Sequence, residues 1–126
     1  MTVREFYIER RRAETPVFLN VLKALRADRL GYRPHDRRPS AEQLVWTLTS
    51  ELRLTEIISK MDEASWNRVA QFYYNGRVVS EQPVGQFLWF ILFDAIHHRG
   101  QLSAYLRPMG GAVPAIYGPS ADSRAA

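Results

Sequence analysis

The sequence contains no cysteine and no long apolar run. Without cysteine the chain cannot form disulfides, bind a metal through thiolates or use a thiol as a nucleophile. The first residues, Met-Thr-Val-Arg-Glu, lack the apolar centre of a signal peptide. No segment approaches the roughly 18 apolar residues of a membrane-spanning helix. We therefore expect a soluble, cytoplasmic protein with no membrane partner.

Lysine is scarce as well, occurring only at Lys23 and Lys60, so arginine carries nearly all of the positive charge. The 126 residues have a formal net charge of +4. Basic proteins often bind nucleic acids, but these arginines are scattered, and the densest run, residues 10–12, must face several directions around a helix. We expect a solvated basic surface and no nucleic-acid partner.

Strand signals are weak, and the pattern favours an all-α fold in a single domain over residues 1–126. Pro16 either kinks one long first helix or begins a second helix capped by Thr15, and we favour the kinked helix. The segment 28–39 carries glycine and prolines among charged residues and predicts a loop. Apolar residues recur at helical spacing in three segments: residues 5–26, 41–61 and 83–107.

The boundaries of the later helices follow from local signals. Ser40-Ala-Glu-Gln43 has the form of a capping box, and we expect the helix that it opens to continue to Met61. Residues 62–67 then predict a helix end or bend. Residues 72–81 form an aromatic-to-turn segment in which Val78-Val79 is briefly extended. Pro108 ends the last helix, and residues 112–126 predict a non-helical tail.

Asp94 is the most anomalous residue in the chain, because it lies with His98 on the apolar stripe predicted for the last helix. The other members of this stripe are Phe87, Ile91, Leu102 (or Gln101) and Tyr105. Four residues apart, Asp94 and His98 share one face and offer two ligands to a divalent metal. A buried carboxylate costs several kcal/mol unless it is paired or coordinated. The alternative is that Asp94 forms an ion pair without a metal, either with His98 or with an arginine such as Arg53 or Arg99. Spacing alone leaves both interpretations open.

A family resemblance follows from these residues. The run from Leu88 to Asp122, with its His-His-Arg-Gly-Gln-Leu and Val-Pro-Ala-Ile-Tyr-Gly-Pro-Ser-Ala-Asp, resembles the C-terminal signature of the DinB family. Residues 40–51, SAEQLVWTLTSE, resemble the family's second-helix motif. The resemblance implies a DinB/YfiT-like antiparallel helical bundle.

The resemblance also implies a metal, commonly nickel or zinc, held by three histidines or their substitutes. The pair from the last helix falls on Asp94 and His98. The second-helix position falls on Thr47, which is a poor ligand for such metals. Glu51, one turn further along, would reach the site only if the helix slid or tilted. The expected triad is therefore incomplete.

Two functions follow from the resemblance. The first is a metal-dependent transferase or hydrolase of the thiol S-transferase type, acting on a small-molecule thiol, with Gln101 and Tyr105 contacting ligands or substrate. The second is a non-catalytic dimeric member whose metal site has decayed, leaving a buried Asp94–His98 pair. DNA binding ranks last, because no recognition motif is present.

The middle of the chain is short for this family. The sequence passes from Glu51 to Asp62 without turn residues, where members normally complete a second helix and begin a third. We expect truncated middle helices and an uncovered apolar face. A homodimer would complete the bundle, with exchange of helices as one route.

Overall fold

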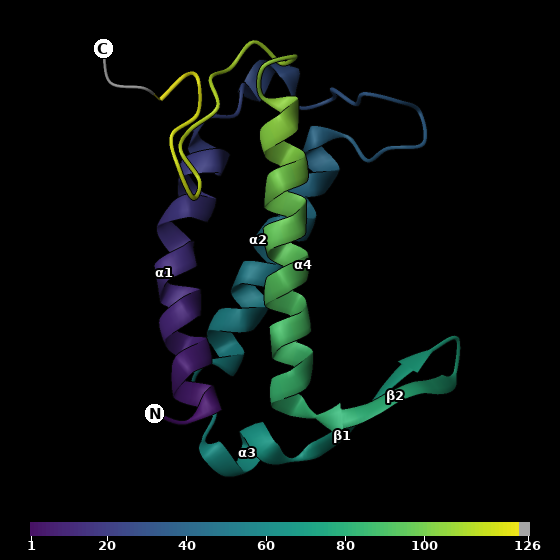
Figure 1. Cartoon of the computed structure of the whole chain (residues 1–126). Coiled ribbons are helices and arrows are strands. Elements are labelled where there is room, and N and C mark those ends of the chain that lie inside the picture. Colours follow the sequence, from purple (N-terminus) through teal and green to yellow (C-terminus); the bar gives the residue numbers. More distant parts are fainter. Residues whose placement is uncertain (124–126) are drawn as a thin grey trace.

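Three long helices lie side by side in a computed structural model of the chain, which describes residues 1–123, and a hairpin projects from one end (Figure 1). The helix α2 runs antiparallel to α1 and α4. The elements follow in this order: α1 (Val3–Lys23), the 3-10 turn η1 (Ala27–Arg29), α2 (Ala41–Ile58), α3 (Glu63–Asn67), β1 (Val69–Tyr74), β2 (Arg77–Pro83) and α4 (Val84–Tyr105).

The prediction of an all-α fold is wrong, because β1 and β2 pair as a two-stranded antiparallel sheet. Asn75 and Gly76 form the two-residue loop, with φ of 50° and 73°. Asn-Gly readily adopts these left-handed angles, which match the twist of a hairpin. Aromatic and β-branched residues on both sides favour extended chain. The hairpin and the five-residue α3 occupy the place where a third long helix was expected to be truncated.

The capping predictions hold for α2. The Ser40 hydroxyl accepts from the Gln43 amide at 3.2 Å, and the Gln43 side chain accepts from the Ser40 amide at 2.8 Å. The helix ends at Ile58, before the predicted Met61, and Asp62 caps α3.

The first helix and the tail also follow the sequence closely. One helix continues through Pro16, as favoured. The hydroxyl of Thr15 donates to the carbonyl of Arg11 inside that helix and caps nothing. Residues 112–123 of the predicted tail are non-helical, and residues 124–126 lie outside the described part of the chain. Among the described helices, none has the length and apolar character needed to cross a bilayer.

The core lies between the three long helices, and α4 buries only part of the predicted stripe: Leu102 and Tyr105 are buried, whereas Phe87, Ile91 and His98 are half-buried. Asp94 has a side chain that is 39% exposed, so its expected burial is wrong. Apolar residues surround most of this helix, and spacing alone therefore cannot select the inward face. The buried residues of α4 are Gly85, Leu88, Leu92, Ala95, Arg99, Leu102 and Tyr105.

Arg99 is the one charged residue on the buried face of α4 and is 1% exposed. Its guanidinium donates to Glu14 of α1 at 2.6 Å and to the Tyr117 hydroxyl of the tail at 2.7 Å. The same hydroxyl donates to the Glu14 carboxylate at 3.0 Å. This buried network connects α1, α4 and the tail. Arg99 is therefore committed to Glu14 and does not pair with Asp94.

Candidate metal centre

Three potential metal ligands meet between α2 and α4. Glu51 comes from α2, and Asp94 and His98 come from successive turns of α4. One ligand atom from each residue lies within 4.8 Å of the others. The two helices pack against each other in opposite directions (Figure 1), which places the middle of α2 beside the middle of α4.

His98 is at the centre of the cluster. Its Nε2 lies 3.3 Å from Asp94 Oδ2 and 3.9 Å from Glu51 Oε1. Ligand atoms around a tetrahedral zinc ion, each about 2.1 Å from the metal, are separated by about 3.4 Å. On its other side, His98 Nδ1 is 3.4 Å from Gln101 Oε1, a contact that orients the ring. The cluster thus has nearly the dimensions of a metal site.

The electrostatics of Glu51 favour a cation at this position. Its side chain is 14% exposed, and its Oε2 is buried without a hydrogen-bond partner among the described residues. Burial, followed by hydrogen bonding to Asp94 and repulsion from it, raises the pKa of Glu51 to about 8. A divalent metal would supply the missing partner and offset both carboxylates. Two carboxylates and one imidazole suit zinc and similar metals.

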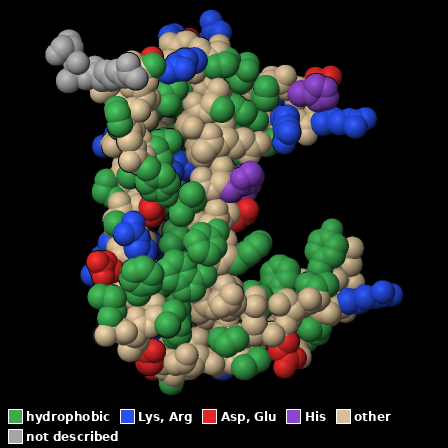
Figure 2. Space-filling model, viewed as in Figure 1, with side chains coloured by type: hydrophobic (Ala, Val, Ile, Leu, Met, Phe, Trp, Pro, Cys, Tyr) green, Lys and Arg blue, Asp and Glu red, His purple; other side chains and the backbone are tan. Residues whose placement is uncertain are grey.

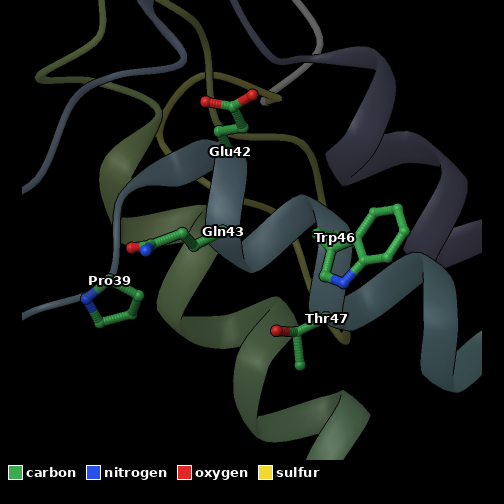
Figure 3. A pocket seen from close by; sticks show the side chains of 5 residues that line it. All are labelled: Pro39, Glu42, Gln43, Trp46 and Thr47. Atoms are coloured by element: carbon green, nitrogen blue, oxygen red, sulfur yellow. The ribbon is translucent and has the colours of Figure 1, made fainter.

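The other residues considered from the sequence lie outside the cluster. Thr47 lines an open depression of about 560 Å³ with Pro39, Glu42, Gln43 and Trp46, and none of the three candidate ligands lines it. In Figure 3, Gln43 and Trp46 point to opposite sides of α2. Tyr105 is buried, and its hydroxyl donates to the Pro39 carbonyl at 2.9 Å. Gln101 alone contacts a candidate ligand, His98.

Glu51 is a candidate ligand whose place in the site was not predicted from the sequence. It was expected to reach the site only through a shift of the helix, yet it stands among the candidate ligands. The signal was its position one turn from Thr47 on the same helical face. How close this face of α2 comes to α4 depends on how the side chains of the two helices pack. The sequence did not reveal that packing.

One side of the molecule is hollowed. Figure 2 shows histidine and acidic side chains on the wall of this concave face, between the connection of α1 to α2 and the projecting hairpin. The cluster itself is open to solvent at Asp94, whose side chain is 39% exposed. A small molecule could approach from this side.

These features define a helical-bundle protein with a candidate metal centre made by two of its helices. Residues 77–125 match the model of the DinB family. The match includes Asp94 and His98, covers the C-terminal part of the chain and agrees with the resemblance of its C-terminal sequence to this family.

A curated relative is also similar to part of the chain. The uncharacterised protein YrdA of Bacillus subtilis (strain 168) is 40% identical over 42 residues, which are 33% of this chain and 25% of that protein. The matched segment thus spans about a quarter of the relative's length. No solved structure matches the chain.

Proposed function

We propose that the chain binds a divalent metal, zinc or nickel, through Glu51, Asp94 and His98, and uses it in a transfer or hydrolysis reaction on a small molecule. The observation that carries this proposal is the buried, unpartnered Oε2 of Glu51 beside two other ligand groups. A protein keeps such an oxygen at a cost unless a cation or proton joins it.

The ligand set suits catalysis. Three protein ligands leave a coordination position open, as in catalytic rather than structural zinc sites. A metal bound there would lower the pKa of a coordinated water or thiol and so supply a nucleophile at neutral pH. The two carboxylates would balance its charge, while Gln101 holds the His98 ring in place.

The substrate class rests on the family resemblance. DinB-like transferases of the thiol S-transferase type act on small thiols, and this chain has no cysteine of its own. A reacting thiol would therefore belong to the substrate. The partly exposed side chain of Asp94 gives such a molecule an approach to the site.

The non-catalytic alternative depended on the absence of a third ligand at Thr47. Glu51 lies one turn further along the same helix and offers that third group. The decayed-site interpretation therefore loses its main support. It would be revived if the chain bound no metal.

The decisive experiment is metal titration of tag-free protein by calorimetry, with metal content measured after dialysis. We expect about one equivalent of zinc or nickel in the wild type and a loss of binding in Glu51→Gln and His98→Ala. Thr47→Ala is the matched control on α2 and should bind as the wild type does. An empty wild type would overturn the proposal, and retention by Glu51→Gln would remove Glu51 from the site.

A further inference from the structure

The side of α4 that faces the hollow is apolar but uncovered. Phe90 is 66% exposed and Phe93 is 61% exposed. Phe87 and Ile91 are half-buried at the edge of this face, and Ile91 packs against the core. Helices that are apolar around most of their circumference are normally buried on all sides. Among residues 1–123, the base of the hairpin covers this face only in part, at Phe87.

The hairpin presents a second apolar surface. Its base packs on α4, where the Phe72 ring lies 5.9 Å from that of Phe87. Its outer part extends away from the helices (Figure 1) and exposes Tyr73, Tyr74 and Val79. A two-stranded sheet without further support is marginally stable in water. The hairpin, residues 69–83, is called the arm below. It therefore needs support that its own chain does not give within the described residues.

These two surfaces are continuous. Phe72 of the arm and Phe87 and Phe90 of α4 line one cavity of about 280 Å³. Hydrophobic side chains follow the hollow from the helix onto the arm in Figure 2. Four aromatic residues of this surface are each more than half exposed: Phe72, Tyr74, Phe90 and Phe93. Covering their exposed parts would bury about 500 Å² per chain, since an aromatic side chain contributes about 150–250 Å².

We propose that a second copy of the chain covers this surface, with the arm of each copy lying on α4 of the other. The aromatic side chains alone supply more than half of the roughly 800 Å² per partner of a standard interface. A symmetric dimer places like patches against each other, so it requires a surface with little charge. Residues 84–96 contain only one charged residue, Asp94, and β1 contains none. The surface is thus suited to a copy of itself.

The arrangement compensates for the short middle of the chain. The helix α3 has five residues, whereas α4 has 22. The arm of the second copy would cover the face of α4 that a further helix covers in a four-helix bundle. The hairpin projects from the helices (Figure 1), which leaves it free to contact another copy. This inference does not depend on metal binding.

The first test measures the mass in solution by sedimentation equilibrium at roughly 5–50 µM protein. Weak dimers with a micromolar Kd dissociate in this range. We expect the wild type at twice the chain mass of 14.6 kDa. Phe90→Glu on α4 and Val79→Lys on the arm should each give folded monomers. Leu19→Glu, an exposed apolar position on α1, is the matched control and should remain dimeric. Circular dichroism verifies folding in each variant.

Two outcomes would overturn the proposal. A monomeric wild type means that this surface is bare or serves a different protein or a lipid. A dimer that survives both Phe90→Glu and Val79→Lys uses another interface. The arm placement has its own test, because the cysteine-free chain allows single cysteines. A short bismaleimide should link Val79→Cys to Gln86→Cys in co-refolded mixtures more than either variant to itself, and dominant Val79→Cys self-linking contradicts arm exchange.

Discussion

The imidazole Nε2 of His98 lies 3.3 Å from the Oδ2 atom of Asp94, one turn earlier on α4. The spacing of four residues in the sequence predicted this contact. Such a pair can exist for its own sake, as an electrostatic contact on a helix surface. The nearby Glu51, with its buried and unpartnered oxygen, is what distinguishes a metal site from a simple pair.

Replacing Asp94 by asparagine tests whether its charge serves the metal. Asp94→Asn keeps the size of the side chain but removes a charged ligand, and we expect zinc or nickel affinity to fall at least about tenfold. The pKa of Glu51 should also fall toward its ordinary value, because Asp94 contributes to raising it. Calorimetric titration measures the affinity. Unchanged affinity would mean that Asp94 serves only His98.

The pH dependence of stability has a definite sign. The pKa of Glu51 is raised from 4.5 to about 8 in the folded chain, so the folded state holds a proton that the unfolded state releases between these values. The free energy of unfolding of the metal-free protein should therefore fall as pH rises from 5 to 8, by about 1–3 kcal/mol. Urea unfolding at several pH values measures this change.

Glu51→Gln is the control for that dependence, because glutamine stays neutral throughout. The free energy of unfolding of this variant should therefore decline only slightly between pH 5 and 8. Saturating zinc should reverse the trend in the wild type, because the metal binds the deprotonated carboxylate. Equal pH profiles for the wild type and Glu51→Gln would show that this carboxyl group titrates normally.

The buried network around Arg99 should contribute strongly to stability. Arg99→Met removes the 2.6 Å ion pair of the buried Glu14 and leaves this carboxylate the longer contact with Arg10, at 3.6 Å, so we expect a loss of about 3–5 kcal/mol. Tyr117→Phe removes only hydroxyl hydrogen bonds and should cost about 1–2 kcal/mol. Combining Arg99→Met with Glu14→Gln should recover part of the loss. Strict additivity in this double-mutant cycle would contradict a coupled network.

Two glycines of α4 should respond in opposite ways to alanine. A methyl group at Gly85 would collide with the Trp66 ring, so Gly85→Ala should destabilise by about 1–3 kcal/mol. At Gly100 a methyl group meets nothing within 4 Å, and Gly100→Ala should stabilise the helix by about 0.5–1 kcal/mol. Thermal unfolding measures both. A stabilising Gly85→Ala would contradict the packing of α3 on α4.

Much of the helical framework could be predicted from sequence, since it depends on local signals. The Ser40–Gln43 capping box and the proline-glycine stop after α4 involve neighbours along the chain. The hairpin was also encoded locally, in Asn75-Gly76 between β-branched and aromatic residues. It was missed because each strand is short and the flanking helical patterns dominated the interpretation.

The site was only half predictable, for a physical reason. Asp94 and His98 share one helix, so their proximity follows from helical geometry. Glu51 joins them through the packing of α2 on α4, and the depth of that contact depends on side chains from both helices. The inward face of α4 was misassigned because Phe87 and Ile91 are as apolar as Leu88 and Leu92.

The contact of Arg99 with Glu14 has a consequence for the synthesis of the chain. Glu14 precedes Arg99 by 85 residues and Tyr117 by 103 residues. At about 5–20 residues per second, the nascent chain carries this carboxylate for several seconds before its partners exist. The first two helices therefore complete their packing only after α4 and residues 112–123 have emerged.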